Sequence, residues 1–123
     1  MKSIAVVDDD YRIRDLICSE LIDEGIEPIP CSDGQDLLDL LDKRSVNLIL
    51  LDIMMPRMDG ITCLKHLKDR SNTIPVLMVT ALNGSTEIEE AKELGANEII
   101  LKPDLFDYLP DLIEKYLDNK TNQ

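Results

Sequence analysis

The sequence predicts an α/β fold in which five parallel strands form a doubly wound sheet and five helices cover its two faces. Short apolar runs alternate five times with segments of helical periodicity, and most of these runs end in a polar residue. One run carries two prolines, which is typical of an edge strand. The five predicted strands occupy residues 4–7, 26–30, 46–51, 76–79 and 98–101.

The first helix follows the acidic triplet at residues 8–10, and its apolar residues recur at helical spacing as far as about Glu24. Asp10 can cap the N-terminus of this helix, and Gly25 can end it. In the run at 26–30 the two prolines cannot donate ladder hydrogen bonds. We therefore expect that strand at an edge of the sheet.

The second helix is expected to begin at a capping box formed by Ser32 and Gln35, and its buried face is rich in leucine. The run at 46–51 is apolar throughout, which indicates a strand covered on both faces. A third helix follows Gly60. These elements complete two strand–helix–strand units.

The second half of the chain repeats the same alternation. A turn is predicted over residues 82–85, after which a second capping box, Thr86 with Glu89, begins the fourth helix. Gly95 ends that helix.

The last helix spans about residues 105–117. Pro110 fits the first turn of a helix better than its interior, which favours a start near Leu109. We expect one compact domain over residues 1–118, followed by a polar tail at 119–123.

The proline-marked edge makes 2-1-3-4-5 the natural strand order, which is that of flavodoxin-like folds. The first and third strands then lie side by side, so Asp8, Asp9 and Asp52 should be neighbours at the carboxyl edge of the sheet. Two like charges about 4 Å apart repel by roughly 4 kcal/mol at an effective dielectric near 20. Such a cluster needs a cation or a proton.

Mg²⁺ is the favoured cation, because it takes one or two carboxylates and completes its octahedron with water and phosphate oxygens. The backbone carbonyl of Met54 is a further candidate ligand. Thr80 and Lys102, at the ends of two more strands, suit phosphoryl oxygens as a hydroxyl donor and a point charge. This set of groups points to phosphoryl transfer, with Asp52 as the nucleophile.

Each of these residues also has a simpler interpretation when taken alone. The acids at 8–10 could complement a helix dipole, and Asp52, Thr80 and Lys102 could be ordinary loop or surface residues. Their shared position, each at the end of a separate buried strand, favours a common site.

The formal net charge of −12 disfavours direct binding to nucleic acid, because a polyanion would be repelled. No apolar stretch approaches the length of a membrane span. The first residues lead straight into a strand, without room for a cleavable signal, and the three cysteines follow no metal or redox spacing. We therefore expect a cytoplasmic protein with reduced thiols.

Four motifs together resemble the receiver domain of two-component response regulators, particularly the stand-alone receivers of chemotaxis and phosphorelays. They are V-V-D-D-D, L-L-D-I-M-M-P-R-M-D-G, V-T-A and L-K-P, in that order over residues 6–103. The resemblance implies a phosphorylation-operated switch that is not an enzyme, apart from Mg²⁺-dependent self-phosphorylation and autodephosphorylation.

The resemblance also implies a role for each residue. Asp52 would be the phosphoacceptor, Asp9 a direct Mg²⁺ ligand and Asp8 a partner that acts partly through water. Asp52 and the Met54 carbonyl would complete the metal site. Thr80 would be the switch hydroxyl and Lys102 the phosphate-pairing lysine, and in this family the bond before the next proline is commonly cis.

The partners implied are a sensor histidine kinase or histidine phosphotransfer protein and an output protein or fused effector domain. The face formed by the last two helices and the fifth strand is a possible homodimer surface. Two positions depart from the family pattern: Ile99 replaces the usual aromatic switch partner, and Asp104 follows the L-K-P motif, with Phe106 two residues later.

Two other classes of protein share part of this pattern of motifs. A haloacid-dehalogenase-like phosphatase would use Asp8 as its nucleophile within Asp8-x-Asp10, but it would leave Asp52 without a role. A mononucleotide binder would place its phosphate loop after the first strand, where three aspartates would repel the ligand.

Overall fold

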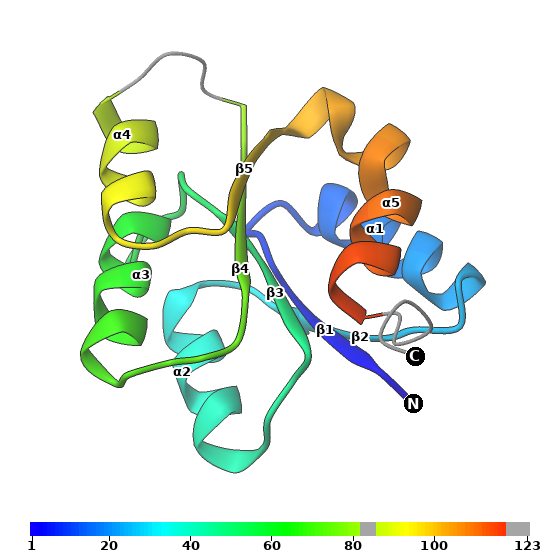
Figure 1. Ribbon diagram of the computed structural model, residues 1–123, viewed down its shortest axis with the longest axis horizontal. Helices are drawn as coiled ribbons and strands as arrows, with labels where there is room; N and C mark the ends of the chain where they lie inside the picture. The colour runs from blue at the N-terminus through cyan, green and yellow to red at the C-terminus, as the bar shows by residue number, and fades with distance from the viewer. Residues whose placement is uncertain (82–85, 118–123) are drawn as a thin grey trace.

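The computed structural model describes residues 1–81 and 86–117. Its five strands are parallel and lie in the order β2-β1-β3-β4-β5, which confirms the predicted topology (Figure 1). The strands are Ser3–Val7 (β1), Glu27–Cys31 (β2), Leu48–Asp52 (β3), Val76–Thr80 (β4) and Glu98–Leu101 (β5).

Five α-helices connect and cover these strands. They are Tyr11–Asp23 (α1), Gly34–Lys43 (α2), Gly60–Asp69 (α3), Thr86–Glu93 (α4) and Leu105–Leu117 (α5), and a short 3₁₀ turn, Lys102–Asp104 (η1), precedes α5. In Figure 1, α1 and α5 lie on one side of the sheet and α2, α3 and α4 on the other. The chain is therefore doubly wound, as the alternation of strands and helices predicts.

The core is divided by the sheet into two apolar layers. Leu37 of α2 and Leu67 of α3 pack in one layer, and Leu21 of α1 and Leu109 of α5 pack in the other. All five residues of β3 are buried, because the strand is covered from both sides. This arrangement fixes β3, and with it Asp52, at the centre of the molecule.

The start of α2 differs from the prediction by one residue. The N-cap is Asp33, not Ser32, and its side chain accepts a hydrogen bond of 2.9 Å from the Asp36 amide. The Asp36 carboxylate in turn accepts one of 3.0 Å from the Ser32 amide. Serine and aspartate are both good caps, and burial selects Asp33, whose side chain is 3% exposed. The predicted box of Ser32 with Gln35 is therefore wrong.

The last helix, α5, spans Leu105–Leu117, which confirms the predicted range. It includes Pro110, so the later start near Leu109 that this proline favours is wrong. The proline is exposed, while Leu105, Leu109 and Leu112 on either side of it are buried. Packing of these leucines against the sheet outweighs the lost hydrogen bond. The peptide bond before Pro103 is trans, in contrast to what the family resemblance implies.

The remaining differences concern the ends of segments. Thr86 is the first residue of α4 rather than its cap, and its hydroxyl donates to Glu87 Oε1 at 2.8 Å. The turn predicted at 82–85 and the tail at 119–123 lie outside the described residues. Within the described ranges, none of the helices has the length and hydropathy needed to cross a bilayer.

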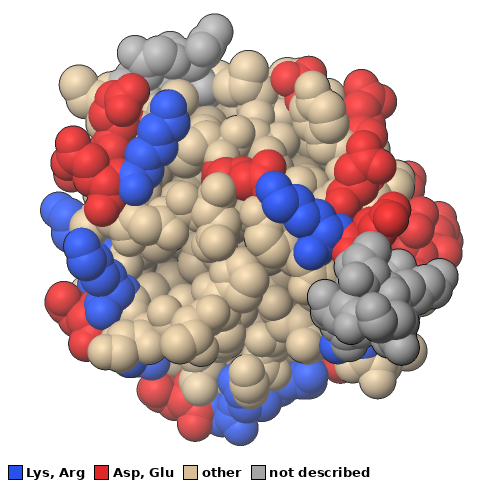
Figure 2. Space-filling model, in the orientation of Figure 1, with Lys and Arg blue, Asp and Glu red and all other residues tan. Residues whose placement is uncertain are grey.

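Charged side chains of both signs are mixed on the surface. On the face drawn in Figure 2 they lie mainly around the rim, with blue and red groups next to one another. Ion pairs tie neighbouring elements together, among them Arg44–Glu27 at 3.1 Å, Arg70–Asp42 at 2.9 Å and Lys115–Glu98 at 2.9 Å. Each pair neutralises one acid locally and leaves the net excess of acid unchanged.

Candidate functional site

The candidate site lies at the carboxyl ends of the strands. Asp8 follows β1, Asp52 ends β3, Thr80 ends β4 and Lys102 follows β5. Asp52 pairs in register with Val79, the residue before Thr80. Asp52 and Thr80 therefore lie at the ends of adjacent strands. The sheet order brings together four of the residues that the sequence singled out.

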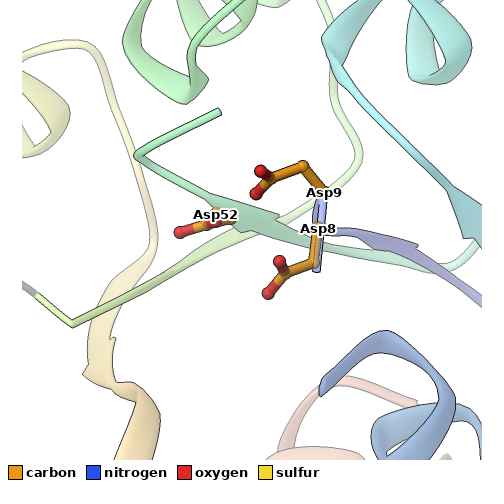
Figure 3. A group of neighbouring side chains, drawn as sticks. All are labelled: Asp8, Asp9 and Asp52. Carbon is orange, nitrogen blue, oxygen red and sulfur yellow. The ribbon is translucent and has the colours of Figure 1, made fainter. Parts of the chain in front are cut away.

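The three carboxylates lie close together. Asp8, Asp9 and Asp52 each offer an oxygen within 4.8 Å of the others. Figure 3 shows Asp8 and Asp9 at the end of β1, with Asp52 beside them on β3. Asp8 and Asp52 are buried, at 2% and 3% exposure, whereas Asp9 is exposed. Access to the cluster is therefore from the side of Asp9.

Lys102 contributes a cation to the two buried acids. Its Nζ lies 3.1 Å from Asp8 Oδ2 and 3.3 Å from Asp52 Oδ2. Because Lys102 bridges both carboxylates, it offsets part of their mutual repulsion.

The burial of Asp52 changes its acidity. Desolvation and the charge of Asp8 raise the pKa of Asp52 to about 6, although Lys102 and the Met54 amide act in the opposite direction. Burial also opposes the charged form of Lys102, but the charges of Asp52 and Asp8 prevail and raise the Lys102 pKa. Asp52 is therefore mostly ionised at neutral pH while remaining easy to protonate in mildly acidic solution.

Hydrogen bonds to and from the backbone hold Asp8 and Asp52 in place. The Asp10 amide donates to Asp8 Oδ1 at 2.9 Å, and the Arg14 guanidinium donates to the Asp8 carbonyl at 2.9 Å. The Met54 amide lies 3.4 Å from Asp52 Oδ1, and the Met54 side chain is exposed. Met54 thus lies next to the Asp52 carboxylate, as its position in the chain predicts.

Thr80 is fully buried at the end of β4. It pairs in register with Leu101, next to Lys102. Ile99 lies two residues earlier on β5, opposite Met78, and is half-buried. An aliphatic side chain therefore occupies the position where the family resemblance implies an aromatic one.

Sequence reasoning missed several residues that shape the site. Arg14 was not singled out, although its place one helical turn after Asp10 directs it back toward the β1 end. Arg57 and Asp33 form an ion pair across 24 residues of sequence, and no local pattern signals it.

The donor set fits a hard divalent cation. Three carboxylates offer only oxygen, which is the ligand type that Mg²⁺ prefers, and the open side at Asp9 leaves room for water or phosphate oxygens. A soft metal would require sulfur or imidazole ligands.

Comparisons with known proteins point to one family. Over 98% of its length, the chain is 38% identical to sporulation initiation phosphotransferase F of Bacillus subtilis (strain 168) and covers 98% of that protein. It is 42% identical over 103 residues, or 84% of its length, to the transcriptional regulatory protein CpxR of Escherichia coli (strain K12). The chain spans 44% of CpxR.

Solved structures show the same fold. The chemotaxis protein CheY4 of Vibrio cholerae matches with a TM-score of 0.86 at 28% identity, covering 95% of this chain and 99% of that one. The response regulator TrrA of Thermotoga maritima, in complex with Mg²⁺–BeF, matches with a TM-score of 0.84 at 29% identity, covering 95% and 100%. The comparisons give no support to the haloacid-dehalogenase-like alternative.

The cluster of acids, the bridging lysine and the strand order therefore agree with what these relatives share. Residues 4–114, from β1 into α5, match the family described as the response regulator receiver domain, and the chain belongs to that family.

Proposed function

We propose that this chain accepts a phosphoryl group on Asp52 from a phosphohistidine and thereby changes which protein it binds. The observation that carries the proposal is the geometry around Asp52. A buried carboxylate lies within 4.8 Å of two other acids and 3.3 Å from the Lys102 ammonium, at the open edge of the sheet.

Asp52 is the nucleophile of the proposed reaction. A carboxylate oxygen attacks phosphorus, the bond from phosphorus to the donor imidazole nitrogen breaks, and the imidazole leaves with the electron pair and takes up a proton. The Asp52 pKa of about 6 keeps the attacking oxygen mostly ionised at neutral pH.

Asp8, Asp9, Asp52 and the Met54 carbonyl would hold Mg²⁺, with Asp9 in direct contact. The ion supplies positive charge that offsets the negative charge of the acids and of the incoming phosphoryl group. The complex of TrrA with Mg²⁺–BeF favours the same assignment here.

Thr80 and Lys102 would bind the transferred group. Lys102 pairs with Asp8 and Asp52 before transfer, and its ammonium can follow the charge to the phosphoryl oxygens afterwards. Movement of the buried Thr80 toward a phosphoryl oxygen would shift the end of β4, and this is the proposed switch.

The proposed donor is a sensor histidine kinase or a histidine phosphotransfer protein, and the reader is an output protein or a fused effector domain. The name of the Bacillus subtilis relative, a phosphotransferase, favours a role in passing phosphate along a relay. We place this chemistry in the cytoplasm, and we assign the chain self-phosphorylation and autodephosphorylation but no further catalytic activity. A homodimer through α4, β5 and α5 is the proposed association of the switched form.

Mass spectrometry after incubation with Mg²⁺ and acetyl phosphate tests the proposal. The wild type should gain one phosphoryl group, and Asp52→Asn should gain none. Asp10→Asn is the matched control, because asparagine is also a good helix cap and Asp10 is not one of the clustered acids. A wild type without added mass, or an Asp52→Asn variant that is still modified, would contradict the proposal.

A further inference from the structure

The loop between β3 and α3, residues 53–59, contains an unusual backbone conformation. Arg57 has a φ of 63°, in the left-handed region that residues other than glycine and asparagine seldom adopt. This loop begins directly after Asp52 and carries Met54. A residue held in this region costs about 1–3 kcal/mol, so surrounding contacts have to stabilise the loop conformation.

An ion pair with a distant residue supplies one such contact. The Arg57 guanidinium pairs with the carboxylate of Asp33, the N-cap of α2. The Asp33 side chain is only 3% exposed, and its other oxygen accepts the Asp36 amide at 2.9 Å. Both oxygens of this buried carboxylate are thus engaged, one by the helix and one by the loop.

Apolar packing supplies a second contact between the same two segments. A Cβ added to Gly34 would lie 2.9 Å from the Met58 sulfur, so the residue after Arg57 rests against the first turn of α2. At the far end of the loop, the Gly60 amide donates to the Ile53 carbonyl at 2.8 Å. The loop is consequently closed at its base and attached to α2 along its side.

We propose that Arg57, acting through Asp33, is a positioning residue for the metal site, because it fixes the loop that carries Met54. The Met54 amide lies 3.4 Å from Asp52 Oδ1, and the Met54 carbonyl is the proposed metal ligand. The inference rests on the proposed function. It adds that Mg²⁺ affinity depends on an ion pair that touches neither the metal nor the phosphoryl group.

Calorimetric titration with Mg²⁺ tests this role without requiring phosphorylation. We expect Arg57→Ala and Asp33→Asn each to weaken Mg²⁺ binding by about tenfold, the lower end of what loss of an outer-shell partner costs. Asparagine keeps the helix cap, so Asp33→Asn removes mainly the charge. Because the two residues act as one pair, the double variant should bind Mg²⁺ no more weakly than either single variant.

Two further variants separate the ion pair from the backbone. Arg57→Lys keeps the charge and should recover part of the affinity. Arg57→Gly relieves the left-handed backbone but removes the ion pair, so it should bind as weakly as Arg57→Ala. Wild-type affinity in Arg57→Gly would overturn the inference.

Arg44→Ala is the matched control. It removes another arginine–carboxylate pair, with Glu27, which joins the C-terminal end of α2 to the start of β2. Its Mg²⁺ affinity should equal that of the wild type. If the wild type is phosphorylated on Asp52 but Arg57→Ala binds Mg²⁺ within about twofold of it, the inference fails while the proposed function stands.

Amide exchange in metal-free protein gives an independent measurement. Exchange of residues 53–59 should be faster in Arg57→Ala than in the wild type, while exchange of β3 stays the same. Unchanged exchange in the loop would show that the ion pair does not hold it, which would also overturn the inference.

Discussion

The backbone of Gly60 passes so close to that of Asp52 that a Cβ on residue 60 would lie 2.2 Å from the Asp52 carbonyl oxygen. The same Cβ would lie 2.8 Å from the Cα of Ile53. Backbone atoms cannot move aside as a flexible side chain can. The first residue of α3 is therefore packed directly against the end of β3 that carries Asp52.

Gly60→Ala should destabilise the protein by about 3 kcal/mol or more, the upper end of the range for overpacking, because the clash is with backbone atoms. Urea denaturation measures the change. Gly25→Ala is the control, since Gly25 has a φ of +78° but nothing within 4 Å of its Cβ position. Left-handed strain alone should make that variant less stable by about 1 kcal/mol. Equal losses in the two variants would contradict the steric argument.

The pKa of Asp52 predicts how stability varies with pH. Its folded-state pKa of about 6 exceeds the ordinary value of 3.8, so the folded protein holds this proton more tightly than the unfolded chain does. Stability from this group is present at low pH and is lost as the pH rises through about 6.

Asp52→Asn should therefore stabilise metal-free protein at about pH 7.5, by on the order of 2 kcal/mol, and have little effect near pH 4. Chemical denaturation at both pH values provides the measurement. Asp69→Asn, at an exposed position on α3, is the control and should leave the free energy of unfolding nearly unchanged at both pH values. If Asp52→Asn gains the same stability at both pH values, the charge of Asp52 is not the cause of the gain.

Mg²⁺ should raise the melting temperature of the wild type. A ligand at 100 times its Kd stabilises the folded state by about 2.7 kcal/mol, if it does not bind the unfolded chain. Asp9→Asn should abolish most of this effect without unfolding the protein, because Asp9 is exposed. Calorimetry at matched ionic strength with Na⁺ distinguishes binding from screening. A melting temperature that Mg²⁺ leaves unchanged would refute the metal site.

Lys102→Gln should have opposite effects on stability and on metal binding. Two buried acids lose their bridging cation, so metal-free protein should lose about 2 kcal/mol at neutral pH. Removing the competing ammonium should at the same time tighten Mg²⁺ binding. Lys115→Gln, which breaks the more exposed pair with Glu98, is the control and should change both quantities little. Weaker Mg²⁺ binding by Lys102→Gln would contradict the argument that the ammonium and Mg²⁺ compete for the same carboxylates.

Much of the fold could be predicted because its signals are local. The observed β5, Glu98–Leu101, coincides with the predicted strand, and the site acids could be located because each follows an apolar run. Once the two prolines of β2 placed that strand at the edge, the order of the sheet brought Asp8 and Asp52 together. Register and burial follow from this topology.

The features that could not be predicted depend on contacts between distant segments. Ser32 and Asp33 are both good caps, and only the burial of Asp33 against the loop after β3 decides between them. The left-handed backbone of Arg57 has no signal in its neighbours, because arginine is not a residue that favours it. Pro110 argues locally against a helix that the surrounding leucines stabilise from both sides.

The prolines of β2 have a consequence beyond strand order. The Glu27 amide donates to the Lys2 carbonyl at 2.9 Å, toward β1, so Pro28 and Pro30 occupy the positions whose nitrogens face away from the sheet. The outer edge of β2 therefore lacks N–H donors at both positions, and another strand would pair with it poorly. Any extension of the sheet by an added strand, whether in assembly or in aggregation, is thereby directed to the opposite margin at β5.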